Sequence, residues 1–443
     1  MSMFSYFKFD DRTDPKIKIA ANLSFLACFG TSGWIASLMN FMNFTKQEFN
    51  LTAFDFGLIL SVNETAVLFG FIISIMLAYI SESRLLGILV ALAGTAITLC
   101  TFAQFEIPLL SSVYTLIGDR ISSFTVNMAI FAFIISLSYE YFEASKESLV
   151  KHSTDSADTP IILSKITAYG LLGTASGFLT VTVLGFIPMN IVLESGSADI
   201  KYYILYPLIG LPLIIIGILS SKKAAAAKAL KENIEFIIRG KFFNFYILTF
   251  FTSIINIIMI YFGAFFLVEK FHMGLGFIGL IFLLHSSLVF FLRRKATEIM
   301  KNKGEDVTMK IRYLVSFIFF LVLIFTATPL VAEDSFMKYV LLGILSLYGT
   351  TTLFDNAIKS FISYFATPNE QRSNAVIYDR LIFAAKIVFP FTTGLLYFNF
   401  GDDYGYYAVF GLGAVSAALC LIVSFRIYAA YNDSDDGGIV EEG

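Results

Sequence analysis

Six charged side chains stand inside long apolar stretches of this 443-residue chain, although nearby loops could hold them at a lower cost in free energy. They are Glu64, Asp119, Arg120, Asp355, Lys359 and Lys386. A charge at the centre of a bilayer costs about 2.5–3.5 kcal/mol on insertion scales, so such residues mark function by default. Carboxylates can carry a proton, and Lys and Arg can hold an anion. These side chains are therefore candidates for binding a charged solute or a coupling ion.

Three of these residues should lie near the middle of a membrane. At a rise of about 1.5 Å per residue, Glu64, Arg120 and Lys386 are each about 15 Å from one end of their apolar stretch. A bilayer core is about 30 Å thick. We expect Arg120 to contact an anionic group of the substrate, or to hold a carboxylate until the binding of substrate releases it. Asn127 lies on the same helical face. The alternative is a permanent ion pair with Asp119 or Glu64.

The remaining charges suggest proton coupling and solute binding. Burial favours the neutral form of a carboxyl group, so Glu64 is the first candidate for the proton site. The alternative is a helix–helix hydrogen bond from a carboxyl group that stays protonated. Asp355 and Asn356 offer a carboxylate and an amide to the same solute as Lys386. Asp355 could instead pair with Lys359, four residues further along a helix.

The elements that must position these side chains are membrane helices. The chain is 57% hydrophobic and only 15% charged, and its mean hydropathy is +0.76. This composition excludes an ordinary soluble enzyme, a disordered chain, a nucleic-acid-binding domain and a disulfide scaffold. Because a membrane helix needs about 20 mostly apolar residues, the sequence predicts twelve spans. The spans are 19–45, 55–81, 85–105, 108–139, 166–193, 202–221, 242–268, 271–292, 313–332, 339–363, 376–400 and 404–425.

Basic residues predict the orientation of these spans. With the N-terminus in the cytoplasm, cytoplasmic segments hold 24 of the 31 Lys and Arg residues. Both termini are therefore expected to be cytoplasmic. The Ala- and Lys-rich stretch 222–241 predicts an interfacial linker helix, or alternatively a solvated tether. The predicted organisation is a six-helix half (1–221), this linker (222–241), a second six-helix half (242–430) and a cytoplasmic tail (431–443).

A short internal repeat supports two halves. The pair Tyr141-Phe142 follows the fourth span, and Tyr364-Phe365 follows the tenth, 223 residues later. Twelve spans, two cytoplasmic termini, a basic central loop and repeating halves resemble the major facilitator superfamily over about residues 15–430. The resemblance implies two six-helix halves that rock about a site near the midplane of the membrane.

Two motifs carry this resemblance at the level of residues. Between spans two and three, the family has a small residue, an acid, basic residues and a Gly, and this chain has Ala78, Glu82, Arg84 and Gly87. In span four the family has an Arg after a Gly, and this chain reads Gly118-Asp119-Arg120. Charges at cytoplasmic helix ends form a gate in the family. The resemblance thus implies a gate of Glu82, Arg84, Asp379 and Arg380, with plain topology signals as the alternative.

Spans one and seven face the central cavity in the family. The resemblance therefore implies that the cavity is lined by Trp34 and Asn40 from span one and by Asn256 and Tyr261 from span seven. Trp34 could stack on a ligand, but packing between helices explains a lone tryptophan equally well.

The predicted function is secondary active transport of a small organic solute, anionic or zwitterionic, coupled to protons. We expect a multi-pass protein of the inner or plasma membrane, monomeric, with the lipid bilayer, protons and a small-molecule substrate as partners. No enzyme signature, cofactor motif, metal-ligand spacing or Walker motif is present in the sequence, and no nucleic-acid partner is expected. Two alternatives remain: a proton-coupled exporter of drugs or metabolites, and a sensor or assembly factor that does not transport.

Overall fold

The computed structural model describes residues 13–49, 51–69, 79–117, 121–154, 158–188, 200–222, 242–355 and 368–435, together with Phe9 and Met76. Within these residues the chain forms helices and no strand, which confirms the all-α fold. Eleven helices of the described part are long and apolar enough to span a membrane. The predicted span 55–81 contains residues 70–75 and 77–78, which lie outside the described part, so the count of twelve stays a prediction. The orientation of the termini also stays a prediction.

The chain divides into two compact units, Met1–Lys231 with His272–Ser286 and Glu232–Phe271 with Ser287–Gly443. The first unit contains α2 (Pro15–Phe49), α3 (Ala53–Thr65), η1 (Ala66–Phe69), α5 (Glu82–Leu99), η2 (Cys100–Phe102), η3 (Pro108–Leu110), α6 (Ser111–Ile117), α7 (Ser123–Ser153), α8 (Thr159–Phe186), α9 (Ile200–Ser221) and the start of α12 (Leu275–Lys303). The predicted linker helix cannot be compared, because residues 223–241 lie outside the described part.

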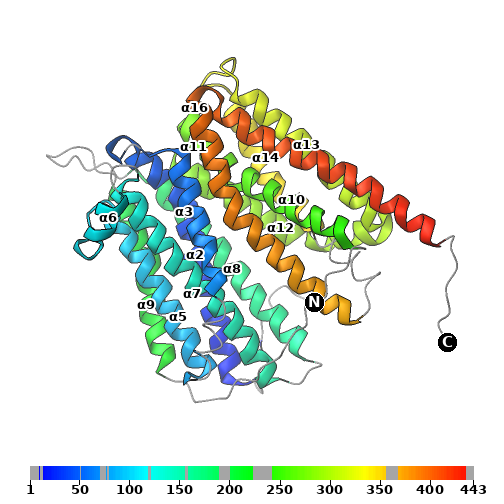
Figure 1. The fold of residues 1–443 in the computed structure, drawn as a ribbon. Helices are drawn as coiled ribbons and strands as arrows, with labels where there is room; N and C mark the ends of the chain where they lie inside the picture. Colours follow the sequence, from blue (N-terminus) through cyan, green and yellow to red (C-terminus); the bar gives the residue numbers. More distant parts are fainter. Residues whose placement is uncertain are drawn as a thin grey trace. The chain divides into compact units, whose positions relative to one another are not determined.

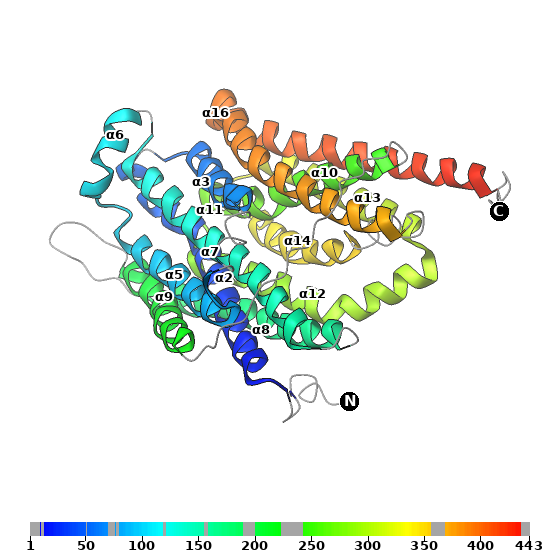
Figure 2. The ribbon, with the colours of Figure 1, turned by 60° about the horizontal axis from the view of Figure 1, so that its bottom comes forward.

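Close helix pairs build the first unit. In Figures 1 and 2, α2 runs beside α8, and α5 runs beside α9. A Cβ atom placed on Gly94 would lie 2.6 Å from the backbone oxygen of Gly210, and one on Gly87 would lie 2.6 Å from that of Gly217. Small residues at such crossings let two backbones approach, which is how membrane helices pack without a hydrophobic driving force.

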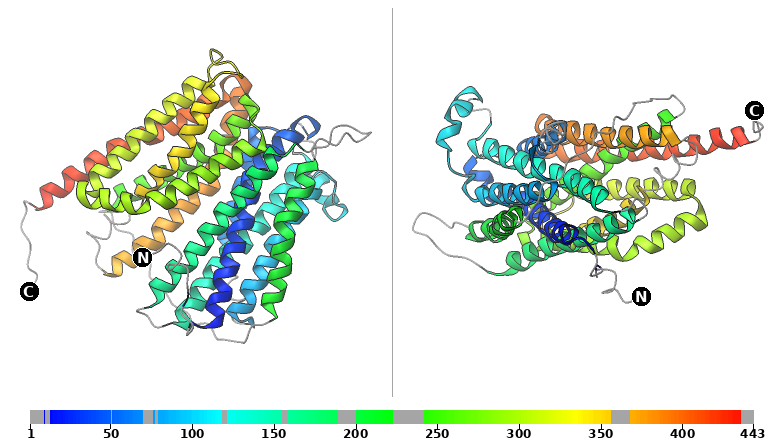
Figure 3. Two further views of the ribbon diagram at one scale, coloured as in Figure 1. Left: turned by 180° about the vertical axis from the view of Figure 1, so that it is seen from behind. Right: turned by 90° about the horizontal axis from the view of Figure 1, so that it is seen from below.

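The second unit contains the predicted spans seven to twelve, apart from the start of α12. Its elements are α10 (Phe243–Ile257), the π-helical turn η6 (Ile258–Phe262), α11 (Gly263–Phe271), the rest of α12, α13 (Glu305–Ala327), α14 (Met337–Thr352), η7 (Leu353–Asp355) and α16 (Pro368–Asp435). The backbone of α16 bends at Gly401, where φ is 68°. The helices α10 and α13 both pack on α16, and Figure 3 shows α13 beside its C-terminal part.

The fourth span starts later than predicted. Residues 108–117 form the short helices η3 and α6, and the long helix α7 begins only at Ser123. The side chain of Ser122 caps this helix by accepting a hydrogen bond from the backbone N–H of Thr125 at 3.1 Å. The predicted start at residue 108 is therefore wrong, and the depth inferred for Arg120 loses its basis. Asp119 and Arg120 lie outside the described residues.

Candidate functional site

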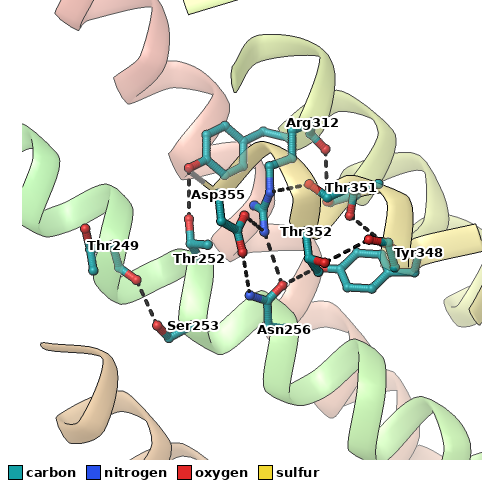
Figure 4. Close-up of polar contacts among 12 residues, drawn as sticks. Thr249, Thr252, Ser253, Asn256, Arg312, Tyr348, Thr351, Thr352 and Asp355 are labelled. Carbon is teal, nitrogen blue, oxygen red and sulfur yellow. Dashed lines mark hydrogen bonds and ion pairs between the residues drawn. The ribbon is translucent and has the colours of Figure 1, made fainter. Parts of the chain in front are cut away.

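A buried ion pair is the centre of a polar cluster in the second unit (Figure 4). The guanidinium of Arg312, on α13, pairs through Nη2 with Oδ1 of Asp355, at the end of η7. The Arg312 side chain is 0% exposed, whereas that of Asp355 is 23% exposed. Nε of Arg312 also donates to the backbone oxygen of Thr351 at 3.2 Å. The cation is thus fixed from two sides.

Asn256, on α10, joins this ion pair to a third helix. Its Oδ1 accepts from Nη2 of Arg312 at 3.2 Å and from the hydroxyl of Tyr348 at 2.7 Å. Its Nδ2 donates to Oδ2 of Asp355 at 3.2 Å. The cluster thereby ties α10, α13 and α14 with η7 together, and both oxygens of Asp355 have partners.

A cavity of about 230 Å³ borders this cluster in the same unit. Four of its lining residues, Thr249, Thr252, Ser253 and Asn256, follow the i, i+3, i+4, i+7 pattern, so α10 turns one polar face to the cavity. The other lining residues come from η6, η7 and α16: Ile260, Tyr261, Asp355, Tyr378, Ile382 and Lys386, together with Ile257 at the end of α10.

The π-helical turn η6 interrupts the seventh span beside the cavity. It covers Ile258–Phe262 and joins α10 to α11 without a break in the helix. A π-turn inserts an extra residue into the helical register and occurs frequently at functional sites. Two of its residues, Ile260 and Tyr261, line the cavity. The turn therefore adds an apolar and an aromatic side chain to the polar face of α10.

The structure brings four of the predicted site residues together. Asp355, Lys386, Asn256 and Tyr261 all line this cavity. The ammonium of Lys386 lies 5.9 Å from the centre of the Phe383 ring. Asn356 and Lys359 lie outside the described residues. Within the described part, Asp355 forms an ion pair with Arg312. The alternative pair with Lys359 stays a prediction, because Lys359 lies outside the described residues.

Arg312 was missed by the sequence reasoning. The predicted spans 271–292 and 313–332 leave residues 293–312 in a loop, but α12 continues to Lys303 and α13 begins at Glu305. Arg312 is therefore about two turns inside α13. The signal was present in the sequence: Gly304, followed by the acids Glu305 and Asp306, is typical of a helix start.

The described candidates of the first unit, Glu64 and Asn127, have different partners. Glu64, in α3, is partly exposed, and its Oε1 accepts from Nδ2 of Asn63 at 3.4 Å. Asn127 holds the turn after α5, because Nδ2 donates to the backbone oxygens of Ala103 and Phe105 at 3.0 and 2.9 Å. The amide of Asn127 is thus engaged by the backbone of its own unit.

The two cavity candidates of span one are also buried in the first unit. Trp34 is 2% exposed, which fits the packing alternative. Asn40 is 7% exposed, and its Nδ2 donates to the backbone oxygen of Met273 at 2.9 Å.

The predicted gate residues have different surroundings. Oε1 of Glu82 accepts from Oγ of Ser148 at 2.5 Å and lies 2.7 Å from Nδ1 of His152, both on α7. Arg84 and Arg380 are exposed, and the side chain of Asp379 lies outside the described residues. A gate formed by these charges stays a prediction.

Comparison with known proteins identifies the fold. No family model and no curated protein matches the sequence. Among solved structures, a bacterial homologue of the human lysosomal transporter Spinster matches with a TM-score of 0.65 and 10% identity, covering 94% of this chain and 96% of that one. A mutant form of the nucleoside transporter NupG matches with a TM-score of 0.67 and 14% identity over 94% and 99%. A bacterial homologue of the iron transporter ferroportin matches with a TM-score of 0.64 and 12% identity over 96% and 100%.

These similarities define a class of protein. The chain is a multi-pass membrane protein with the fold of the major facilitator superfamily, as the sequence predicted. At 10–14% identity the similarity shows the fold alone.

Proposed function

We propose that this protein is a secondary transporter, and not an enzyme, which moves a small organic solute by alternating access. It would act as a monomer in the inner or plasma membrane. Its structural neighbours are transporters of different solutes, and carriers of this kind place their solute site within the bundle at the level of the membrane interior. The proposed site is the cavity of the second unit.

The observation that carries the proposal is a charged cavity wall in an otherwise apolar bundle. Asp355 and Lys386 reach the cavity directly, and Arg312 stands behind Asp355. These three side chains carry two positive charges and one negative charge, a balance that favours an anionic or zwitterionic solute. Drug-sized ligands occupy pockets of about 300–1,000 Å³. A cavity of about 230 Å³ therefore supports a small metabolite over a multidrug substrate.

We propose protons as the coupling ion. Two acids can serve: Glu64 in the first unit, and Asp355, whose side chain is 23% exposed beside the cavity. A proton on Asp355 would remove the charge that attracts Arg312. Proton uptake and the affinity for the solute would therefore be coupled at this carboxylate.

The test is proton movement in proteoliposomes that contain a pH-sensitive dye, challenged with pools of organic anions, amino acids, peptides, nucleosides and cationic drugs. Wild type is compared with Glu64→Gln, Arg120→Ala and Lys386→Gln. Lys338→Gln is the matched control, because Lys338 lies on α14 and does not line the cavity.

A solute-dependent proton flux that falls with Glu64→Gln and Lys386→Gln, but not with Lys338→Gln, supports the proposal. A flux only with cations, insensitive to Arg120→Ala and Lys386→Gln, would favour an exporter of cations. No flux and no solute counterflow with any pool, from folded protein, would overturn the proposed transport.

A further inference from the structure

The hydroxyl groups of the cavity indicate the polarity of the transported solute, an inference that rests on the proposed transport function. Oγ1 of Thr249 donates its hydrogen to the backbone oxygen of Phe245 at 2.8 Å. Oγ of Ser253 donates its hydrogen to the backbone oxygen of Thr249 at 3.0 Å. A hydroxyl group has one hydrogen, so both groups are left with lone pairs to offer to the cavity.

The carboxylate of Asp355 adds more acceptor capacity to the same region. Its Oδ1 is buried and pairs with Arg312. Its Oδ2 accepts from Asn256, and a carboxylate oxygen can accept about two hydrogen bonds. Figure 4 shows Asp355 near the polar face of α10 that carries Thr249, Thr252 and Ser253. Thr252 is bonded to the hydroxyl of Tyr313 at 2.8 Å. This region of the cavity therefore attracts a hydrogen-bond donor, and most strongly a cationic one.

Lys386 gives the same cavity the opposite polarity. It reaches the cavity from α16, and its ammonium has three donors and no acceptor. Three isoleucines, Ile257, Ile260 and Ile382, complete the wall with apolar surface. A matching solute carries a donor cation, an anion and a small apolar part.

We infer that the solute is a small zwitterion of the amino-acid type. Its ammonium group would bind Asp355, Ser253 and Thr249, its acidic group would bind Lys386, and its side chain would pack on the isoleucines. Drug-sized ligands occupy pockets of about 300–1,000 Å³, so a cavity of about 230 Å³ favours a free amino acid over a long peptide.

Solutes with one charge fit this wall less well. A solute with an acidic group and no amine would bind Lys386 but would bring no hydrogen-bond donor to Asp355, Ser253 and Thr249. An amine without an acid would satisfy Asp355 but place its charge in the same small cavity as Lys386. Hydrogen bonds between charged groups are the strong ones, so losing either end should cost about ten- to a hundredfold in affinity.

The experiment uses the purified full-length chain and three compounds of one skeleton: leucine, leucinamide and 4-methylpentanoate. They carry both charges, only the cation and only the anion. Binding is measured by thermal shift and titration calorimetry, and transport by counterflow in proteoliposomes, with a panel of smaller amino acids beside leucine. The expected result is binding of at least one amino acid about tenfold tighter than its amide and its deaminated acid.

Two variants assign the ends of the solute. Lys386→Gln should weaken the amino acid about tenfold, because its acidic group loses a partner, and should leave the amide as tight or tighter, because its cation no longer shares the cavity with a like charge. Ser253→Ala should weaken the amino acid and the amide several-fold and leave the deaminated acid unchanged. Its control is Ser416→Ala, since Ser416 makes the same bond to a helix carbonyl, that of Leu412 at 2.8 Å, away from the cavity. Ser253→Ala also spares the buried ion pair, which Asp355→Asn would break.

The outcomes separate this inference from the transport function. Transport of anions, cations or neutral solutes, without competition by any amino acid, overturns the zwitterion and keeps the transporter. Amino acids that bind with equal affinity to wild type and Lys386→Gln overturn the assigned site. A lack of transport with every pool overturns the proposed function itself.

Discussion

Arg312 shows how much one buried side chain controls in this protein. Its guanidinium is fully buried, and its Nη1 has no hydrogen-bond partner among the described residues. Taking a cation out of water costs several kcal/mol, and only a well-placed anion with further hydrogen bonds offsets that cost. Asp355, Asn256 and the oxygen of Thr351 supply this compensation. The position of η7 at the cavity therefore depends on Arg312.

Replacing one residue of this ion pair should destabilise the protein more than replacing both residues. We expect Arg312→Met and Asp355→Leu each to destabilise the protein by about 3–5 kcal/mol, because each leaves one charge buried without its partner. The double variant should recover most of the lost stability, since neither charge is left in the interior. The melting temperatures of the three variants in detergent, compared with wild type, test this expectation. Additive losses in the double variant would show that the pair does not act as a unit.

Sequence reasoning finds polar residues inside apolar runs and misses those at the edges of runs. Asp355 and Lys386 are predicted because each charge interrupts an apolar stretch, and Asn256 and Tyr261 are predicted from the family resemblance of span seven; all four line the cavity. Arg312 directly precedes the apolar run 313–332. Because this predicted span ends at the nearest charged residue on each side, Arg312 itself is assigned to the loop. Which residues face one another also requires the three-dimensional packing, so the partner of Asp355 could not be derived.

At the scale of elements, composition predicts that a helix exists better than where it ends. Most predicted spans coincide with helices, but α12 continues through a basic stretch to Lys303 because Lys and Arg are good helix formers. For the fourth span the N-terminal boundary is wrong, because Ser122 caps α7 and the helix begins at Ser123. The π-helical turn Ile258–Phe262 lies inside the predicted span 242–268, because an apolar stretch predicts that a helix exists and not which hydrogen-bond register it adopts.

The pairing of α5 with α9 depends on glycines and can be tested by adding one methyl group. A Cβ atom on Gly94 would lie 2.6 Å from the backbone oxygen of Gly210 and 2.9 Å from the backbone nitrogen of Ile214. Backbone atoms cannot move aside cheaply, so Gly94→Ala should destabilise the protein by about 1–3 kcal/mol. Gly411→Ala is the control, because a Cβ there meets nothing within 4 Å.

The control has an expected sign of its own. Within a helix, alanine is favoured over glycine by about 1 kcal/mol, so Gly411→Ala should leave the melting temperature unchanged or raise it. Equal melting temperatures for the Gly94→Ala and Gly411→Ala variants would contradict the close approach of α5 and α9.

At the scale of the whole molecule, the division along the sequence differs from the division in space. The predicted second half begins at residue 242, but His272–Ser286 belongs to the first unit. There Phe282 stacks on Phe178 of α8, with ring centres 5.3 Å apart, and Asn40 donates to the backbone oxygen of Met273. A segment from the second half of the sequence thus completes the first unit.

This exchange predicts how the chain behaves when it is cut in two. A fragment of residues 1–222, expressed alone, lacks the segment that covers α8 and should be degraded or aggregate. Co-expression with a fragment of residues 242–443 restores this segment, so the two fragments should co-purify through a tag on either one.

Gly185→Val should reduce the yield of the co-purified fragments several-fold, because a Cβ on Gly185 would lie 2.5 Å from the Cα of Gly276. Gly343→Ala, where a Cβ meets nothing within 4 Å, should not reduce it. If 1–222 instead purifies alone with the melting temperature of the full chain, His272–Ser286 contributes nothing to the stability of the first unit.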